Sequence, residues 1–399
     1  MAAPFLPYGR QSIDDSDVAA VAAALRSDWL TTGPAVTAFE EAFAAAVGAS
    51  WALACANGTA ALHLAMLALE IGPGDAAIAP SITFVATANA AHYVGATPVF
   101  ADVDPDTGLM TPASLDDAIG RARSAGLVPK VALPVHYAGQ TAPMRELAAV
   151  ACAHGLHLVE DACHALGTTS DAGPVGACEQ SVLSTFSFHP VKTIACGEGG
   201  MVTGRDPVLA ERIRRGRSHG LVRDPAQFSD PALSVGPNGQ GHPWAYEMPA
   251  PGFNYRLSDI NAALGSSQLA RLAWFAERRR RLAGLYQEAF VRFPATVRLI
   301  PAVPGCDPVL HLQVALIDFD GLGLARADVM RALAARRIGS QVHYIPVHRQ
   351  PFYAGLYPGL TLPGADAFFA RCLSLPLYPD MADADVSRVV ATLGEVLGL

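Results

Sequence analysis

The sequence predicts an α/β protein: a large domain on a mostly parallel β-sheet, followed by a smaller α+β domain. Two observations support this class. Short, apolar, β-rich segments alternate with helix-like segments through the first half of the chain. This rhythm breaks after about Gly220, and the remaining chain has fewer helices and several short strands. We place the boundary near a long predicted helix, which gives domains at residues 1–260 and 261–399.

The elements of the first half can be assigned in order. Each expected strand is a short apolar run bounded by turn residues, and each expected helix follows the strand before it. Ser114 is expected to cap one helix, with Asp116 and Asp117 in its first turn. The expected strands are 51–56, 76–82, 97–102, 131–135, 156–160 and 181–189, and the expected helices are 59–70, 85–93, 114–124 and 143–154.

The second half starts with a segment rich in Pro, Gly, Ser and Asn. Residues 224–252 are predicted to form a long loop, and loops of this length in compact proteins are usually functional or disordered. A long helix is expected over 258–290, with a break near Ala273. Short strands are expected at 310–317 and 339–343.

Composition narrows the class of protein. The chain has 399 residues, of which 51% are apolar and 16% charged, and its net charge is −8. Such a chain can bury a core, and its low charged fraction suggests that a partner subunit covers part of the surface. The basic run at 278–281 fits a solvated helix face better than a nucleic-acid patch. We therefore expect no nucleic-acid partner.

Membrane segments and metal sites are not expected either. No apolar run reaches the length of a membrane span, and residues 1–10 lack a signal-peptide pattern. The seven cysteines are odd in number and scattered, as in a reduced, cytoplasmic protein. The twelve histidines show no HExxH or similar pattern, so no metal site is expected. The glycines at 197–200 do not form a dinucleotide motif.

The most informative stretch lies between Glu160 and Gly200. One apolar run ends in Glu160 and Asp161, and a second is followed by Lys192. Open α/β sheets bind ligands at the carboxyl ends of their strands, so Asp161 and Lys192 can meet at one site. A lysine that forms a Schiff base and a carboxylate that keeps a pyridine nitrogen protonated are what pyridoxal phosphate requires. The chain holds only one other lysine, Lys130.

A phosphate site is predicted at another strand-to-helix junction. Asn57 and Gly58 precede a helix, where glycine lets a phosphate approach unpaired N–H groups, and the Thr59 hydroxyl can add a contact. The alternative is an ordinary helix cap without a ligand. Ser187, five residues before Lys192, is a second candidate hydroxyl, although it can equally be structural.

Further candidates each have a structural alternative. His164 follows Asp161 by three residues and can contact the cofactor ring, or it can be a core histidine. Phe84 follows a strand and can stack on the ring, or it can belong to the core. His343 and His348 flank Pro346 in a turn-like segment, which suits contact with a substrate better than a metal cage.

Together these segments resemble the sugar-nucleotide aminotransferases, which are fold type I, pyridoxal-phosphate-dependent enzymes. Within this family the likeness is greatest to the aminotransferase of pseudaminic acid biosynthesis, through residues 80–90, 164–167 and 341–344 and His189. The family-like segments occur in the family's order: Leu30-Thr31-Thr32-Gly33-Pro34, Asn57-Gly58-Thr59-Ala60, Glu160-Asp161-Ala162, Ser187-Phe188-His189-Pro190-Val191-Lys192, Gly197-Glu198-Gly199-Gly200, Ser218-His219-Gly220, Gly252-Phe253-Asn254-Tyr255-Arg256 and His343-Tyr344-Ile345-Pro346.

The resemblance implies roles at matching positions. Lys192 would carry the cofactor and move protons, and Asp161 would pair with the ring nitrogen. Asn254 would reach the phosphate of a neighbouring subunit, which implies a homodimer with shared sites. The other implied cofactor contacts are Gly58, Thr59 and Ser187 at the phosphate, Phe84 on the ring face and His164 near the ring hydroxyl; the implied substrate contacts are Thr32, His189, Tyr255, His343 and His348.

The resemblance also implies the reaction. Glutamate would donate an amino group to a keto sugar nucleotide, for which UDP-4-keto-6-deoxy-N-acetyl-L-altrosamine is the candidate. The segment 224–246 is longer than expected for the pseudaminic acid enzyme, and we expect it to shape the sugar-nucleotide site. One alternative is a related sugar dehydratase, but such relatives carry histidine in place of the Schiff-base lysine. The other is a non-catalytic, cofactor-binding regulatory protein, which the complete set of Asp161, Ser187 and Lys192 disfavours.

Overall fold

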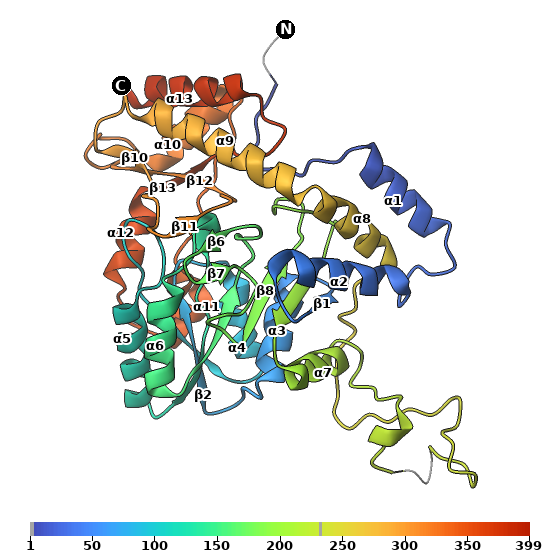
Figure 1. Ribbon diagram of the computed structural model, residues 1–399. Helices are drawn as coiled ribbons and strands as arrows, with labels where there is room; N and C mark the ends of the chain where they lie inside the picture. Colours follow the sequence, from blue (N-terminus) through green and yellow to red (C-terminus); the bar gives the residue numbers. More distant parts are fainter. Residues whose placement is uncertain (1–3, 231–233) are drawn as a thin grey trace.

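A seven-stranded sheet forms the centre of the computed structural model, which describes residues 4–230 and 234–399 (Figure 1). The strand order is β1-β9-β8-β5-β4-β2-β3. All neighbouring pairs are parallel except the two that β9 makes, so β9 alone runs in reverse. The predicted α/β class with a mostly parallel sheet is confirmed. The strands are β1 Trp51–Cys55, β2 Asp75–Pro80, β3 Thr97–Ala101, β4 Val128–Ala132, β5 His157–Asp161, β8 Leu183–Ser187 and β9 Gly200–Gly204.

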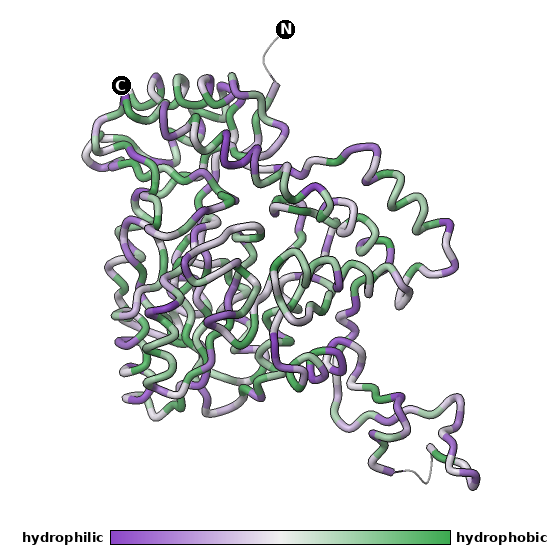
Figure 2. Tube along the Cα trace, in the orientation of Figure 1, coloured by the Kyte–Doolittle hydropathy of each residue, from purple (hydrophilic) through white to green (hydrophobic). Residues whose placement is uncertain are grey.

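Helices cover both faces of this sheet, because alternate side chains of its buried strands point to opposite sides. Val159 and Leu183 pack against the helices of one face, whereas Leu158 and Phe186 pack against those of the other. The first face carries α3 Gly58–Ala68, α4 Val85–Tyr93 and α7 Pro207–Gly216. The second carries α2 Pro34–Val47, α5 Pro112–Ser124, α6 Met144–His154 and α8 Asp259–Ala270. Along the helices in Figure 2, hydrophobic and hydrophilic residues alternate, as expected for helices with one buried face.

The carboxyl-terminal part has its own three-stranded antiparallel sheet, in the order β10-β12-β13. Its apolar cluster joins this sheet to α9, α10 and α13 and includes Leu6 from the start of the chain. The predicted domain division remains a prediction, and its boundary at residue 260 falls in the first turn of α8. These elements are α9 Leu272–Phe290, β10 Val297–Leu299, β12 Gln313–Ile317, α10 Arg326–Ala335, β13 Cys372–Leu375 and α13 Asp383–Leu397.

Smaller elements complete the architecture. A second three-stranded sheet has the order β11-β6-β7 and joins the segment after β5 to the segment before β12. No helix among residues 4–230 and 234–399 has the length and apolar character of a membrane span. The remaining elements are α1 Asp15–Leu25, β6 Thr169–Ser170, β7 Gly173–Pro174, β11 Cys306–Asp307, α11 Pro351–Leu356 and α12 Pro363–Arg371.

Several predicted boundaries were wrong. Thr111 rather than Ser114 caps α5, because Pro112 favours the first helical position and Ser114 completes a capping box from inside the helix. The strand expected at 131–135 is β4, which starts at Val128 and ends before Pro134. The segment 339–343 is no strand: it makes a single bridge, from Gln341 to Ser374. The break in the long helix falls at Arg271, between α8 and α9, rather than at Ala273.

The predicted long loop is present as an extended excursion after α7. It leaves the body of the molecule and returns before α8, at the lower right of Figure 1. Its described residues hold a short 3-10 turn and two isolated bridges, Val222–Glu247 and Val235–Gly241. Residues 231–233 of the predicted loop and 1–3 of the amino-terminal segment lie outside the described residues.

Candidate active site

The two strands that carry the predicted site residues are parallel neighbours. Asp161 is the last residue of β5 and lies opposite Thr185 of β8. Ser187 is the last residue of β8, and Lys192 lies in the turn that follows it. The structure therefore brings Asp161, Ser187 and Lys192 to one edge of the sheet, as the strand ends predicted.

The two consecutive carboxylates of β5 face opposite sides of the sheet. Asp161 is 5% exposed and accepts two hydrogen bonds, from the Thr87 hydroxyl on α4 at 2.7 Å and from the Cys163 N–H at 3.2 Å. Glu160 lies 2.9 Å from His136 Nε2 on the other side. Only Asp161 can therefore act at the α3/α4 face, and Glu160 is part of a buried pair.

Lys192 approaches the same site from β8. Burial lowers the pKa of its amine, while the neighbouring Cys163 and Asp161 raise it in part. Among the described residues, nothing forms a hydrogen bond or an ion pair with this amine. A partly buried lysine with a lowered pKa and no partner is suited to nucleophilic and proton-transfer chemistry.

The start of α3 has the features of an anion cradle. The Asn57 side chain caps the helix by accepting from the Ala60 N–H at 2.8 Å. The N–H groups of Gly58 and Thr59 have no hydrogen-bond partner within the described part of the chain. A Cβ at Gly58 would lie 2.8 Å from the Ser187 Cβ, so only glycine leaves room between this helix end and β8.

His164 is buried next to the site, and each of its two ring nitrogens has a hydrogen-bond partner. Its Nδ1 is 3.3 Å from the Ala138 backbone N–H, and its Nε2 is 3.1 Å from the Tyr344 hydroxyl. Burial and the charge of Lys192 lower its pKa well below the ordinary value. The ring of Tyr344 also lies 6.0 Å from that of Phe84, which is half exposed.

Two predicted histidines are buried between the carboxyl-terminal part and the large sheet. The His343 Nδ1 is 2.8 Å from the Ser374 hydroxyl, and burial lowers its pKa to about 3. The His348 Nδ1 is 2.6 Å from the Ser81 hydroxyl, just beyond β2. His348 thus tethers the segment after Tyr344 to the carboxyl end of β2.

The other predicted substrate residues lie closer to the surface. The Tyr255 hydroxyl is 3.3 Å from His63 Nδ1 on α3, and the exposed His189 directs its N–H to the Ser187 hydroxyl at 3.4 Å. Thr32 and Asn254 are exposed. Within the described ranges, no hydrogen bond of either one reaches Asp161, Ser187 or Lys192.

Sequence reasoning missed several residues at this site. Tyr344 and His311 contact His164, the latter with ring centroids 4.4 Å apart. Thr87 contacts Asp161, and Thr83 contacts Thr87. A usable signal was present, because these threonines are four residues apart at a strand-to-helix junction, where both hydroxyls can face the sheet edge.

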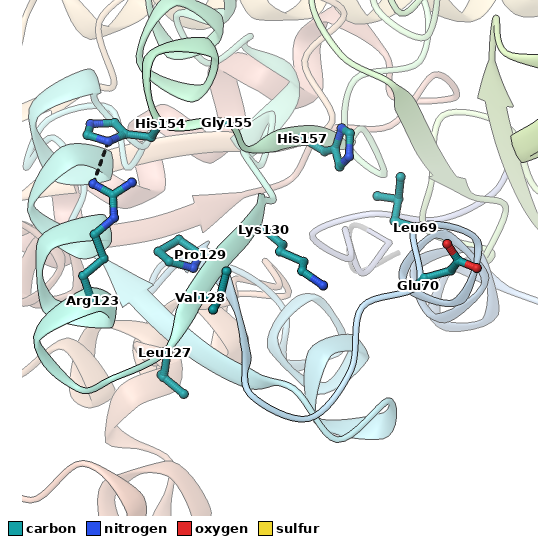
Figure 3. Close-up of a pocket in the computed structure, with 10 residues that line it drawn as sticks. All are labelled: Leu69, Glu70, Arg123, Leu127, Val128, Pro129, Lys130, His154, Gly155 and His157. Atoms are coloured by element: carbon teal, nitrogen blue, oxygen red, sulfur yellow. Dashed lines mark hydrogen bonds between the residues drawn. The ribbon is translucent and has the colours of Figure 1, made fainter.

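A separate surface cavity lies away from this site. Its volume is about 650 Å³, and it opens at the amino ends of β4 and β5 (Figure 3). The Lys130 side chain in it is 3.0 Å from Asp75, so its charge is paired. The described residues contain no group of three side chains suited to a metal ion.

Comparisons with known proteins agree with this geometry. Residues 11–394 match the model of the DegT/DnrJ/EryC1/StrS aminotransferase family. Helicobacter pylori PseC, an aminotransferase involved in the biosynthesis of pseudoaminic acid, is similar in structure, with a TM-score of 0.87, 27% identity and 99% of each chain covered.

Two further solved structures are similar over nearly their whole length. The putative sugar aminotransferase Spr1654 from Streptococcus pneumoniae, in its PLP form, has a TM-score of 0.85 and 27% identity, with 100% of this chain and 99% of that chain covered. DesV from S. venezuelae, in complex with a ketimine intermediate, has a TM-score of 0.84 and 32% identity, with 100% of both chains covered.

Proposed function

The chain belongs to the DegT/DnrJ/EryC1/StrS aminotransferase family, and from that membership and the geometry of the site we propose that it transfers an amino group from glutamate to a keto sugar nucleotide. The family is pyridoxal-phosphate-dependent, and the fold type I expectation is confirmed. The observation that carries the proposal is the meeting, at one sheet edge, of Asp161 with Lys192 and the first N–H groups of α3, which have no hydrogen-bond partner among the described residues.

The residues of the site fit the cofactor. The free N–H groups of Gly58 and Thr59, with the Ser187 hydroxyl, would hold the phosphate at the positive end of the α3 dipole. Asp161 would face the ring nitrogen as a buried carboxylate. When bound, pyridoxal phosphate supplies an aldehyde and an electron-withdrawing ring, which together acidify the α-hydrogen of an attached amine.

Proton transfer would fall to Lys192. Burial lowers the pKa of this amine, which increases the share of neutral amine that can accept a proton. Its position after β8 puts the amine on the same sheet edge as Asp161, where it would take the proton from the donor's α-carbon and return it across the site. One residue would then serve both half-reactions. The keto acid would leave before the keto sugar nucleotide accepts the amino group, which predicts ping-pong kinetics.

The substrate that we propose is more specific than family membership alone implies. We propose UDP-4-keto-6-deoxy-N-acetyl-L-altrosamine, and thus a role in pseudaminic acid biosynthesis; the similarity to PseC supports this. Thr32, His189, Tyr255, His343 and His348 are proposed substrate contacts. His343 and His348 are almost fully buried, so we propose that they form the walls of the sugar site. We propose that the segment 224–252, most of whose described residues are exposed, forms its outer rim.

Two further proposals concern the working molecule. A homodimer with shared sites is supported by the exposed Asn254, which would reach the phosphate of the partner subunit, and by the exposed side chains of Trp244 and Phe253. A cytoplasmic location is supported by the cysteines, all seven of which are free in the described part of the chain.

Glutamate and candidate sugars provide the test. The purified, cofactor-loaded protein is mixed with glutamate alone, and the visible absorbance of the cofactor and the release of 2-oxoglutarate are followed. The proposal predicts loss of the absorbance band with one equivalent of 2-oxoglutarate per site, and recovery of the band on addition of the keto sugar. A matched thymidine-diphosphate keto sugar tests the nucleotide. No response to glutamate would favour the dehydratase or the non-catalytic alternative.

A further inference from the structure

We propose that Thr87, supported by Thr83, is a positioning residue that keeps Asp161 ionised and aimed at the cofactor ring. The inference rests on the proposed pairing of Asp161 with the ring nitrogen. Thr87 lies in the first turn of α4 and Thr83 in the turn after β2, and both are buried, with 0% and 1% exposure. The sequence alone did not predict a role for either threonine.

The directions of the hydrogen bonds follow from the groups involved. The Thr87 hydroxyl is 2.7 Å from Asp161 Oδ2, and an ionised carboxylate can only accept, so Thr87 donates its single proton to Asp161. The hydroxyls of Thr83 and Thr87 are also 2.7 Å apart. Since the proton of Thr87 is already committed, Thr83 must be the donor of that second bond. The chain of donors therefore runs in one direction, from Thr83 through Thr87 to Asp161.

Hydrogen bonds also hold the other carboxylate oxygen of Asp161 and its backbone. Asp161 Oδ1 accepts the Cys163 N–H at 3.2 Å, and the Asp161 backbone N–H donates to Pro134 O at 2.9 Å. The first turn of α4 adds the positive end of its dipole on the Thr87 side. The carboxylate is thus fixed from two directions, while its remaining lone pairs are available to a ring nitrogen.

The charges on the Asp161 carboxylate and on the ring nitrogen explain why these hydrogen bonds would matter. A carboxylate and a protonated ring nitrogen in a dry site can relax to a neutral pair if the proton moves to the carboxylate, because burial disfavours both charges. Donors to the carboxylate stabilise its anionic form and keep the proton on the ring. The titratable groups that interact electrostatically with Asp161 include Lys192, Cys163 and Tyr344. Of these, only Lys192 can carry a positive charge, and it belongs to the reaction.

The ring nitrogen can be observed directly. Pyridoxal phosphate labelled with ¹⁵N in the ring is bound to wild-type protein and to Thr87→Val, Thr87→Ser, Thr83→Val and Asp161→Asn, and the ¹⁵N resonance and the dissociation constant of the cofactor are measured. Thr87→Val keeps the shape of the side chain and removes the hydroxyl, whereas Thr87→Ser keeps the hydroxyl. We expect Thr87→Val to move the resonance toward the unprotonated position and to weaken binding about tenfold.

The matched variants separate the possible outcomes. Thr87→Ser should behave like wild type, and Thr83→Val should shift in the same direction as Thr87→Val by a smaller amount. A wild-type resonance and affinity in Thr87→Val, beside a shifted Asp161→Asn, overturns the inference and leaves the proposed function intact. A wild-type resonance in Asp161→Asn overturns both, because Asp161 would then not face the ring. If Thr87→Val does not fold, Thr87→Ala provides the same comparison.

Discussion

His164 and Ala138 together determine where the imidazole proton of the site lies. The backbone N–H of Ala138 can only donate, and it points at His164 Nδ1 at 3.3 Å, so the single proton of the neutral ring is on Nε2. Nε2 then donates to the Tyr344 hydroxyl, which leaves the proton of that hydroxyl free for another acceptor in the site. The site thus presents a neutral histidine and a tyrosine donor.

Buried neutral histidines should make the stability of the fold depend on pH. Burial lowers the pKa of His164, His311 and His343 in the folded state. Below pH about 6.5 the unfolded chain binds protons that the folded chain does not, so this contribution to stability is full above that pH and falls as the pH decreases. We expect a loss of up to about 1.4 kcal/mol per histidine for each pH unit, measured by urea unfolding.

His311→Phe provides the matched variant, because it keeps an aromatic ring against His164 and removes one titrating group. This variant should lose about a third of the pH dependence of the unfolding free energy that the three histidines produce together. An unchanged slope below pH 6 would contradict the assignment of His311 as a buried neutral group.

Lys192 should be the residue that carries the cofactor. Borohydride reduction of the loaded protein followed by peptide mapping should place the label on Lys192, because the only other lysine, Lys130, is paired with Asp75 at 3.0 Å. Lys192→Ala should lose multiple turnover. Lys130→Arg, which preserves the charge of the surface pair, should retain both label and activity. A label on Lys130 would refute the assignment.

We expect the Asp161 carboxylate to be required for turnover, whereas the neighbouring Glu160 carboxylate should not be required. Asp161→Asn removes the charge at nearly constant volume, and we expect turnover to fall by several orders of magnitude, on the scale of a lost buried charge pair. Glu160→Gln is the matched control, because Glu160 faces His136 on the opposite side. It should reduce stability by about 1–3 kcal/mol and leave the rate nearly unchanged. Equal rates for the two variants would contradict the site.

The cradle at α3 predicts that even an alanine at position 58 weakens the binding of pyridoxal phosphate. Gly58→Ala would place a Cβ 2.8 Å from the Ser187 Cβ, and relief of that overlap should move the Gly58 N–H and the Ser187 hydroxyl, two of the proposed phosphate contacts, apart. The affinity for pyridoxal phosphate should fall about tenfold, as measured by equilibrium titration. Gly120→Ala in α5 meets open space and should instead stabilise the helix by about 0.5–1 kcal/mol. Equal cofactor affinity in both variants would argue against the cradle.

A shared site can be tested by mixing subunits. Lys192→Ala and Asn254→Ala are each shown to be nearly inactive and are then allowed to exchange. If Asn254 acts on the partner's cofactor, one site of each mixed dimer holds both intact residues, and activity should recover in part. Absence of recovery after demonstrated exchange, or full activity of a monomer, would exclude the shared site.

The sequence was sufficient to predict the class of the fold and the meeting of Asp161 with Lys192. Both depend on strand ends, and the position of a strand end in a parallel sheet fixes where its next residue lies. The strand β9, Gly200–Gly204, was not among the predicted strands, and its direction could not have been read from the sequence because a buried strand has the same pattern in either orientation. The contact from Thr87 to Asp161 was also missed, because it joins residues that lie 74 positions apart in the sequence.

The reversed strand β9 has a consequence for synthesis on the ribosome. In the sheet, β1 pairs with β9 alone, so Trp51–Cys55 has no neighbouring strand until Gly200–Gly204 has emerged. The cradle at Gly58 follows β1 directly, and a Cβ at Gly200 would lie 2.3 Å from the Asn57 carbonyl, so the two segments close on each other. A nascent chain shorter than about 200 residues therefore holds Asp161 and Lys192 without a finished phosphate cradle. We therefore expect capture of the cofactor to be a late event, after most of the large sheet has been translated.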